Sequence, residues 1–253
     1  MAREWRRLLL DPARFAAGGD LILEPGEAHY LRRVLRLRRG DRFAVVDGCG
    51  HLWSAVLDEG DRARLEQPPG APLRSEPAPR PQLELLVAPP RRDGDLLLRM
   101  ACELGIDAIT LVQAQRRVAP PTNSERARTI LREACEQCER LWEPRLVLDR
   151  PLQEALSGPT PGDLALLATT RQVGLPALQT LLERHRCAGE ASPGRVRLAI
   201  GPEGGWSPPE EEHALALGWL PVSLGERILR TSTAAVAAAA LLGSWRESLS
   251  GGA

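Results

Sequence analysis

The sequence contains no lysine, so all 33 of its basic residues are arginine, and 33 acidic residues balance them to a formal net charge of zero. It also has no apolar run long enough to cross a bilayer. The apolar stretch after the charged first residues is too short for a signal peptide. The lack of a spanning apolar run excludes a membrane-spanning protein. Together with the lack of a signal peptide, it predicts a cytoplasmic protein with no membrane partner. What is present, 43% hydrophobic and 26% charged residues over 253 positions, is typical of a globular protein with one large domain or two modest ones.

Cysteine is scarce as well, and five scattered residues do not fit a disulfide framework. The pair Cys135 and Cys138 has the spacing of a redox or zinc motif. No second cysteine pair or histidine cluster accompanies it to complete a tetrahedral metal site. Glu133, Glu136 and Glu139 disfavour a reactive thiolate, and we expect the segment to be helical. We therefore predict no metal site.

The zero net charge hides a local excess of arginine near the N-terminus. Residues 1–42 contain ten arginines against six acidic residues, and six of those arginines lie in residues 29–42. Arginine forms paired hydrogen bonds to phosphate and stacks on bases, so this basic stretch is consistent with nucleic-acid binding. The alternative is a solvated helix face whose apolar residues point inward: Leu31, Val34, Leu35 and Leu37. The stretch alone leaves both interpretations open.

A proline-rich segment divides the chain. Residues 67–72, followed by Pro77, Pro79 and Pro81, fit neither a regular helix nor a central strand and predict a linker. Residues 43–48 and 51–57 before it have strand patterns, and the Asp47-Gly48-Cys49-Gly50 break predicts a hairpin turn. We expect a small β-rich domain over residues 1–72 and a second domain over residues 73–253.

After the linker, apolar strand patterns alternate with helical ones, which predicts an α/β domain with a mostly parallel sheet. Gly105 ends the first predicted helix. The expected strands are residues 83–87, 106–112, 164–168, 195–200 and 220–224. The expected helices are residues 95–104, 124–141, 173–185 and the alanine-rich 231–245. That last helix is either buried in the monomer or packed at a dimer interface or across a cofactor loop.

Two loops in this domain are candidates for a ligand site. Residues 201–205 follow a strand with three glycines, and Ser207 and Glu210 have the spacing of a capping box for the next helix. Glycines permit a positive φ and let the backbone approach a ligand closely, and if φ is positive at Gly204, Gly204→Ala is expected to cost more than about 1 kcal/mol. Ligands of open α/β sheets bind outside the carboxyl ends of strands. The alternative is a plain strand-to-helix turn. A second loop, residues 225–230, follows the next strand.

Several segments in the right order resemble one known family. The C-terminal pair is Gly201-Pro202-Glu203-Gly204-Gly205 and Ser223-Leu224-Gly225, the latter followed by Arg227-Ile228-Leu229-Arg230-Thr231 and Thr233-Ala234. The upstream segments are Glu103-Leu104-Gly105-Ile106, then Ala134 to Cys138 with Arg140 and Pro144, and His29 with Arg33-Val34-Leu35-Arg36 and Gly40-Asp41. Together they resemble the bacterial 16S ribosomal RNA (uracil-N3)-methyltransferases of the SPOUT superfamily.

The resemblance implies a small PUA-like β-barrel domain that grips RNA, followed by a SPOUT α/β domain threaded into a trefoil knot. The implied cofactor is S-adenosylmethionine, the implied substrate is a uridine in the decoding region of 16S rRNA or the small ribosomal subunit, and the implied assembly is a homodimer. The cofactor-binding residues would be Ala168, Thr169, Gly201, Pro202, Glu203, Gly204, Gly205, Ser223, Leu224, Gly225, Ile228, Leu229, Arg230, Thr231, Thr233 and Ala234. The RNA-binding residues would be Arg6, Arg7, His29, Arg32, Arg33, Arg36 and Arg140.

Two residues are candidates for catalysis. Arg230 would stabilise negative charge on the uracil carbonyls, and Glu203 would orient substrate or cofactor. Their alternative roles are a loop-stabilising salt bridge and a carboxylate at a helix N-terminus.

The sequence departs from the family pattern at three positions. Ser232 replaces a usual acidic residue, Met100 a usual lysine and Trp142 a usual arginine. Two alternative functions therefore stay open: another SPOUT methyltransferase acting on a ribose 2′-hydroxyl or a guanine, and a non-catalytic RNA-binding assembly protein.

Overall fold

The computed structural model describes residues 5–11, 13–14, 19–170, 172–187 and 193–250. The chain forms two compact units: unit 1 has residues up to 78 together with 132–143, and unit 2 has residues 79–131 together with 144 onward. The predicted boundary between residues 72 and 73 differs from this division, which also groups residues 132–143 with unit 1. No helix among the described residues combines the length and apolarity needed to cross a membrane.

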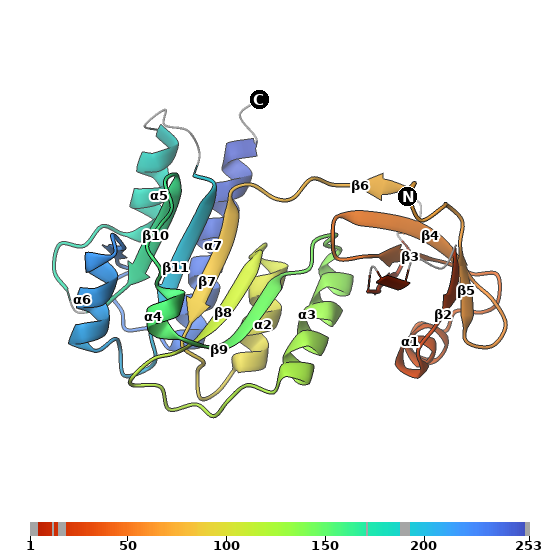
Figure 1. Ribbon diagram of the computed structural model, residues 1–253, viewed down its shortest axis with the longest axis horizontal. Coiled ribbons are helices and arrows are strands. Elements are labelled where there is room, and N and C mark those ends of the chain that lie inside the picture. Colours follow the sequence, from red (N-terminus) through yellow and green to blue (C-terminus); the bar gives the residue numbers. More distant parts are fainter. Residues whose placement is uncertain (1–4, 12, 15–18, 171, 188–192, 251–253) are drawn as a thin grey trace. The chain divides into compact units, whose positions relative to one another are not determined.

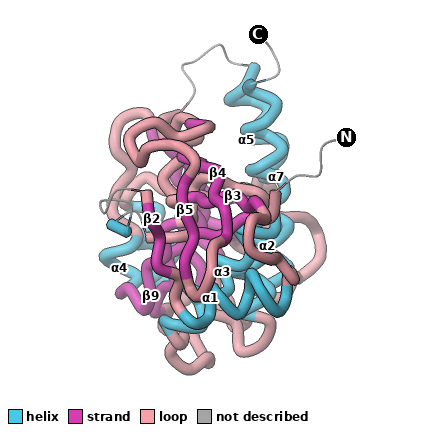
Figure 2. Tube along the Cα trace, turned by 90° about the vertical axis from the view of Figure 1, so that its right-hand side faces the viewer, coloured by secondary structure: helices cyan, strands magenta, loops and turns pink. Residues whose placement is uncertain are grey.

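Unit 1 is built on a six-stranded sheet (Figure 2). Its main path runs β1 (Arg7–Leu9), β3 (Arg42–Val46), β4 (His51–Leu57), β5 (Arg62–Leu65) and β2 (Asp20–Ile22), and β6 (Arg74–Ser75) pairs with β4. Strands β3 and β4 pair antiparallel, and Gly48 and Gly50 between them have positive φ, which confirms the hairpin. A Cβ at Gly50 would lie 2.5 Å from the Glu76 carbonyl oxygen and 2.8 Å from the Trp142 ring, so only glycine fits there.

The arginine-rich stretch folds as α1 (Pro25–His29), then a π-helical turn (Tyr30–Val34) and a loop. Leu31 is fully buried, and Leu35 and Leu37 pack against the core of unit 1, as expected for the inward face. Val34, in contrast, is 60% exposed, so the prediction was wrong for this residue. The π-helical turn has a wider spacing than an α-helix, which changes the face on which a residue lies.

Unit 2 is a parallel six-stranded sheet in the order β12-β10-β11-β7-β8-β9. Figure 1 labels five of these strands, β10, β11, β7, β8 and β9. The strands are β7 (Gln82–Val87), β8 (Ala108–Gln113), β9 (Arg145–Pro151), β10 (Asp163–Ala168), β11 (Arg195–Ile200) and β12 (Leu220–Val222). The helices are α2 (Gly94–Glu103), α3 (Ser124–Cys138), α4 (Leu152–Ala155), α5 (Leu178–Cys187), α6 (Pro208–Ala216) and α7 (Thr231–Ser250). The residues of α3 up to 131 belong to unit 2, and those from 132 belong to unit 1. The predicted parallel α/β domain is confirmed.

Helix α5 begins at Leu178, five residues later than expected. Pro176 explains the late start, because a proline disfavours helical backbone at the residue before it. Ala177 instead forms a bridge to Ser223, which follows β12. The segment before α5 therefore pairs with the residue that follows β12 and does not extend the helix.

The alanine-rich helix α7 is packed within unit 2, against α2, α5, β7 and β11. Ala235, Ala238 and Ala239 are buried. A Cβ at Gly243 would lie 2.5 Å from the Leu104 carbonyl oxygen, so the small residues allow close approach to the end of α2. This packing fits the buried-helix alternative, and a dimer contact through the rest of α7 stays a prediction.

Candidate functional site

The parallel strands of unit 2 end at the same level. Ala168 at the end of β10 pairs in register with Ile200 of β11 and with Val222 of β12, and Ile200 pairs with Val87 of β7. The loops that follow these strands therefore start side by side at one edge of the sheet. This is the edge where open α/β sheets bind ligands.

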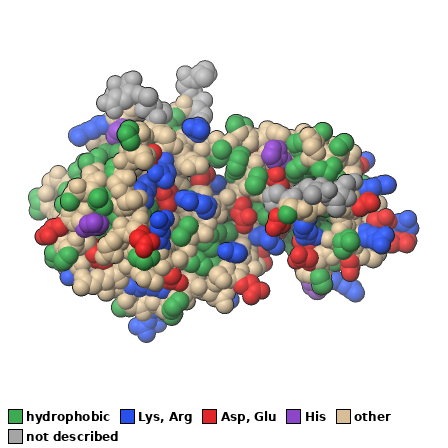
Figure 3. Space-filling view, in the orientation of Figure 1, with side chains coloured by type: hydrophobic (Ala, Val, Ile, Leu, Met, Phe, Trp, Pro, Cys, Tyr) green, Lys and Arg blue, Asp and Glu red, His purple; other side chains and the backbone are tan. Residues whose placement is uncertain are grey.

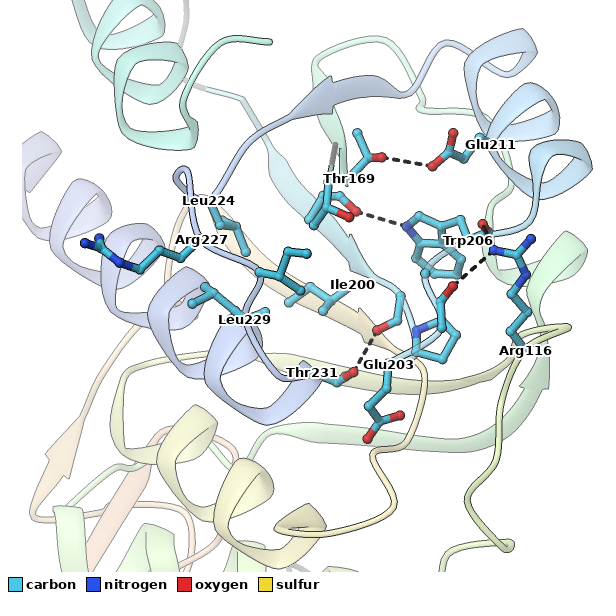
Figure 4. A pocket seen from close by; sticks show the side chains of 18 of the residues that line it. Arg116, Thr169, Ile200, Glu203, Trp206, Glu211, Leu224, Arg227, Leu229 and Thr231 are labelled. Atoms are coloured by element: carbon cyan, nitrogen blue, oxygen red, sulfur yellow. Dashed lines mark hydrogen bonds between the residues drawn. The ribbon is translucent and has the colours of Figure 1, made fainter. Parts of the chain in front are cut away.

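Three of these loops line a pocket, which Figure 4 shows from close by. Predicted cofactor residues that line it are Ala168, Thr169, Gly201, Pro202, Glu203, Gly204, Gly205, Leu224, Gly225, Ile228, Leu229, Thr231 and Ala234. The lining does not include Ser223, Arg230 or Thr233. Ser223 bonds locally to Gly225, and Arg230 and Thr233 are exposed around the start of α7.

Trp206 ties two of the loops together. It is 5% exposed, and its indole N–H donates to the Ala168 carbonyl oxygen at 3.0 Å. Its ring lies so close to Gly201 that an added Cβ would be 3.1 Å away. The Thr231 hydroxyl donates to the Gly201 carbonyl oxygen at 3.0 Å and so connects the third loop (Figure 4). The pocket is therefore fixed by contacts between its own walls.

Charged side chains complete the pocket. The Glu211 carboxylate accepts from the Thr169 hydroxyl at 2.9 Å and from the Gln172 amide at 3.2 Å. The Arg116 guanidinium donates to the carbonyl oxygens of Gly204 and Trp206, each at 3.0 Å. Glu203 is exposed, and one of its oxygens accepts from the Arg91 backbone N–H at 3.2 Å.

Sequence reasoning missed several residues of this pocket: Arg116, Thr170, Ile200, Trp206, Glu211 and Arg227. Trp206 and Glu211 lie next to the glycine loop and its capping box, so their position was a usable signal. Arg116 lies 88 residues before its partner Gly204, and no local pattern marks it.

The condition of a positive φ is met in the glycine loop, but at the neighbouring residue. Gly205, not Gly204, has a positive φ, of 70°. Gly204 instead lies against Arg116, whose Cβ would be 3.3 Å from an added Cβ. The capping role of Glu210 is confirmed, since its carboxylate accepts from the Ser207 N–H at 2.8 Å. Its second oxygen accepts from the Gln115 N–H at 2.7 Å and so holds the loop after β8.

The comparisons with known proteins agree with this architecture. The RNA methyltransferase domain family matches residues 76–243, and the RNA methyltransferase PUA domain family matches residues 23–65. The chain belongs to this family of RNA methyltransferases. Unit 1 thus holds the PUA-like β domain, and unit 2 is an α/β methyltransferase domain that resembles SPOUT structures.

Similar proteins cover most of the chain. A relative from Synechocystis sp., "Ribosomal RNA small subunit methyltransferase E", is 36% identical over 251 residues, covering 96% of this chain and 78% of the relative. One of the same name from Mycobacterium tuberculosis is 30% identical, covering 89% and 87%. A solved structure of that enzyme from Neisseria gonorrhoeae, bound to S-adenosyl methionine, has a TM-score of 0.74 and 27% identity over 95% of this chain and 98% of its own.

The predicted RNA-binding residues of this methyltransferase all lie in unit 1, where they differ in availability. Arg6, His29, Arg33 and Arg36 are exposed. Arg32 is half-buried and donates to the carbonyl oxygens of Asp58 and Gly60, and Arg140 is half-buried as well.

Arg7 differs from these residues because its side chain is buried. Its guanidinium forms a 3.0 Å ion pair with Glu139. Arg7 therefore joins two parts of unit 1 instead of presenting its charge to solvent.

The neighbouring arginines of unit 1 are partly neutralised. Arg39 pairs with Glu59, and Arg42 lies 2.8 Å from Glu66. Blue and red side chains accordingly lie next to one another on this unit in Figure 3. The local excess of positive charge is thus smaller than the sequence count indicates.

The Ala134–Cys138 motif has a structural part in unit 1. Glu136 accepts a 2.8 Å hydrogen bond from the Leu9 N–H, and burial raises the pKa of this carboxyl to about 7. Trp142 packs against Gly50 and donates to the Glu76 carbonyl oxygen at 3.1 Å. The tryptophan that replaces the usual arginine is therefore a packing residue.

Proposed function

We propose that this chain transfers the methyl group of S-adenosylmethionine to N3 of a uridine in 16S rRNA. The pocket formed by the loops after β10, β11 and β12 carries the proposal, together with relatives that match nearly the whole chain. In the reaction the carbon–sulfur bond breaks, the N3–carbon bond forms and N3 loses its proton. The products are N3-methyluridine, S-adenosylhomocysteine and a proton.

The residues of the pocket fit this cofactor. Ile200, Leu224 and Leu229 offer apolar surface for a purine ring, and the loops between them offer backbone N–H and C=O groups. The carboxylates of Glu203 and Glu211 suit a ligand that carries positive charge on its sulfur and amino groups. When bound, S-adenosylmethionine supplies an activated methyl group, and this chain contributes mainly positioning and electrostatic stabilisation.

The target base has to be unpaired, because N3 lies on the Watson–Crick edge. The exposed Arg33 and Arg36 of the PUA-like unit would bind RNA phosphates. Arg230 would stabilise charge on the uracil carbonyls, and Glu203 would orient substrate or cofactor. Because Arg230 is exposed and outside the pocket lining, its role requires movement or the second subunit of the homodimer that we also propose. The site of action would be the cytoplasm, where ribosomes assemble.

The decisive experiment is mass-spectrometric mapping of 16S rRNA after incubation of small subunits with enzyme and S-adenosylmethionine. We expect one methyl group, on N3 of a single uridine. A methyl group on a ribose 2′-hydroxyl or on guanine would replace the proposal with another SPOUT activity. Cofactor binding by calorimetry without methyl transfer to any RNA would favour a non-catalytic assembly protein.

RNA binding itself has a separate test. Neutralising several phosphates makes affinity fall roughly a thousandfold or more over a modest rise in salt. We expect this steep dependence for a 16S rRNA fragment, measured by fluorescence anisotropy, and a shallower one when Arg33 and Arg36 are both changed to Ala. A flat salt profile for the wild-type chain contradicts the arginine assignment.

A further inference from the structure

A second cavity lies at the same edge of the sheet as the cofactor pocket. It has a volume of about 480 Å³, within the usual range of small-molecule sites. Its walls are the loop after β7 with the first turn of α2, Leu111 of β8, and the loop before α3 (residues 89–98 and 119–123). Strand β7 is the direct neighbour of β11 in the sheet, so this cavity follows the cofactor pocket along one edge.

One hydrogen bond connects the two cavities. The Glu203 carboxylate, in the wall of the cofactor pocket, accepts from the backbone N–H of Arg91, in the wall of the second cavity. The order in which strands are added to the sheet also switches sides here. Strands β8 and β9 lie on one side of β7, and the later strands β10, β11 and β12 lie on the other. Such a switch point is where α/β sheets bind ligands.

The second cavity combines apolar walls with positive charge. Leu97 and Leu111 are buried in its walls, and prolines from both loops add flat apolar surface. Arg91 and Arg92 are exposed at its edge. Of the two carboxylates in the same wall, Asp95 is paired with Arg126 and Asp93 is exposed, so the two arginines outnumber the one carboxylate left. The lining therefore suits a ligand with an apolar ring and a negative charge.

We propose that this second cavity holds the target nucleotide of the RNA substrate, with the base against the proline and leucine walls. Arg91 and Arg92 bind its phosphate or carbonyl oxygens. The inference rests on the proposed function, because a methyl acceptor has to lie beside the methyl donor. It adds Arg91 and Arg92, which lie outside the cofactor pocket, as the residues that hold the acceptor.

The test uses Arg91→Ala, Arg92→Ala and the double variant, with Arg99→Ala as the matched control. Arg99 is an exposed arginine of α2, the helix that follows Arg91 and Arg92, and it does not line the cavity. The bond from Arg91 to Glu203 uses the backbone N–H and survives replacement of the side chain. We therefore expect the Kd for S-adenosylmethionine, measured by calorimetry, to stay within twofold of wild type in all variants.

Methylation kinetics with a 16S rRNA fragment give the main readout. We expect the double variant to lower kcat/KM at least tenfold, with kcat itself reduced, and the Arg99→Ala control to match wild type. The salt slope of RNA binding is expected to fall by up to about two, one per lost phosphate contact. Lysine at both positions is expected to restore part of the activity, because it keeps the charge.

Kinetics of the double variant equal to those of the Arg99→Ala control would overturn the proposal. A loss of RNA affinity with unchanged kcat would also overturn it, because it would place Arg91 and Arg92 on flanking RNA. Failure of the wild-type enzyme to methylate uridine would instead refute the proposed function, so the two failures are distinguishable.

Discussion

The two cavities at the sheet edge differ in whether backbone or side chains form their walls. The proposed cofactor pocket is formed largely by the backbone of three loops, held by bonds from Trp206 and Thr231 to carbonyl oxygens. The second cavity presents the exposed side chains of Arg91 and Arg92. A pocket built from backbone depends on the packing behind it, whereas a cavity with charged side chains depends on those side chains directly. Substitutions are therefore expected to harm stability and cofactor binding together in the first, and RNA binding and catalysis, without loss of stability, in the second.

The largest expected effect is that of Trp206→Ala. The change removes a buried ring and the bond to Ala168, so we expect a loss of about 3–5 kcal/mol in the free energy of unfolding. Cofactor affinity is expected to fall more than tenfold because two loops lose their connection. Denaturant unfolding and calorimetry measure the two effects. The control is Trp5→Ala, at an exposed tryptophan; a similar loss there, or normal cofactor binding by Trp206→Ala, contradicts the account.

An intermediate effect is expected at the Thr169–Glu211 hydrogen bond. Glu211→Ala leaves the largely buried Thr169 hydroxyl without its 2.9 Å acceptor, at a cost of about 1–2 kcal/mol. Thr169→Val removes the donor, and the double variant is expected to cost less than the sum of the single changes. Thermal unfolding of all four proteins gives the coupling. Strict additivity would mean that the bond contributes nothing to the pocket.

The smallest expected effect concerns the two neighbouring glycines of the loop. Gly205→Ala places a side chain at φ 70° and is expected to cost about 1 kcal/mol, although the space around it is open. Gly204→Ala has no such backbone strain, and the Arg116 Cβ, which would be 3.3 Å from the added Cβ, has to shift by only a few tenths of an ångström. We expect it to cost less than Gly205→Ala by denaturant unfolding. The reverse order would show that contact with Arg116, rather than φ, limits this loop.

Local patterns were sufficient for most strands of unit 2 and for the glycine loop, because buried parallel strands have continuous apolar runs. Strand β9 (Arg145–Pro151) escaped prediction: it is an edge strand with no fully buried residue, and its pairing with β8 shifts register. Arg116 and the second cavity could not be predicted from the sequence for another reason. Their partners are far apart in the sequence, and only the alignment of strand ends brings them together.

The absence of lysine makes an alkaline pH–rate profile of this chain simpler to interpret. Guanidinium groups as a class stay protonated throughout the alkaline range, and the sequence has no lysine ammonium group that would lose its proton there. The N3 proton of uridine is weakly acidic, and its loss is part of the transfer. A rise of rate with alkaline pH would thus report the ionisation of the substrate without interference from lysine ammonium groups. The arginine-only composition makes the proton of the RNA base, rather than those of basic side chains, the quantity that an alkaline pH–rate profile measures.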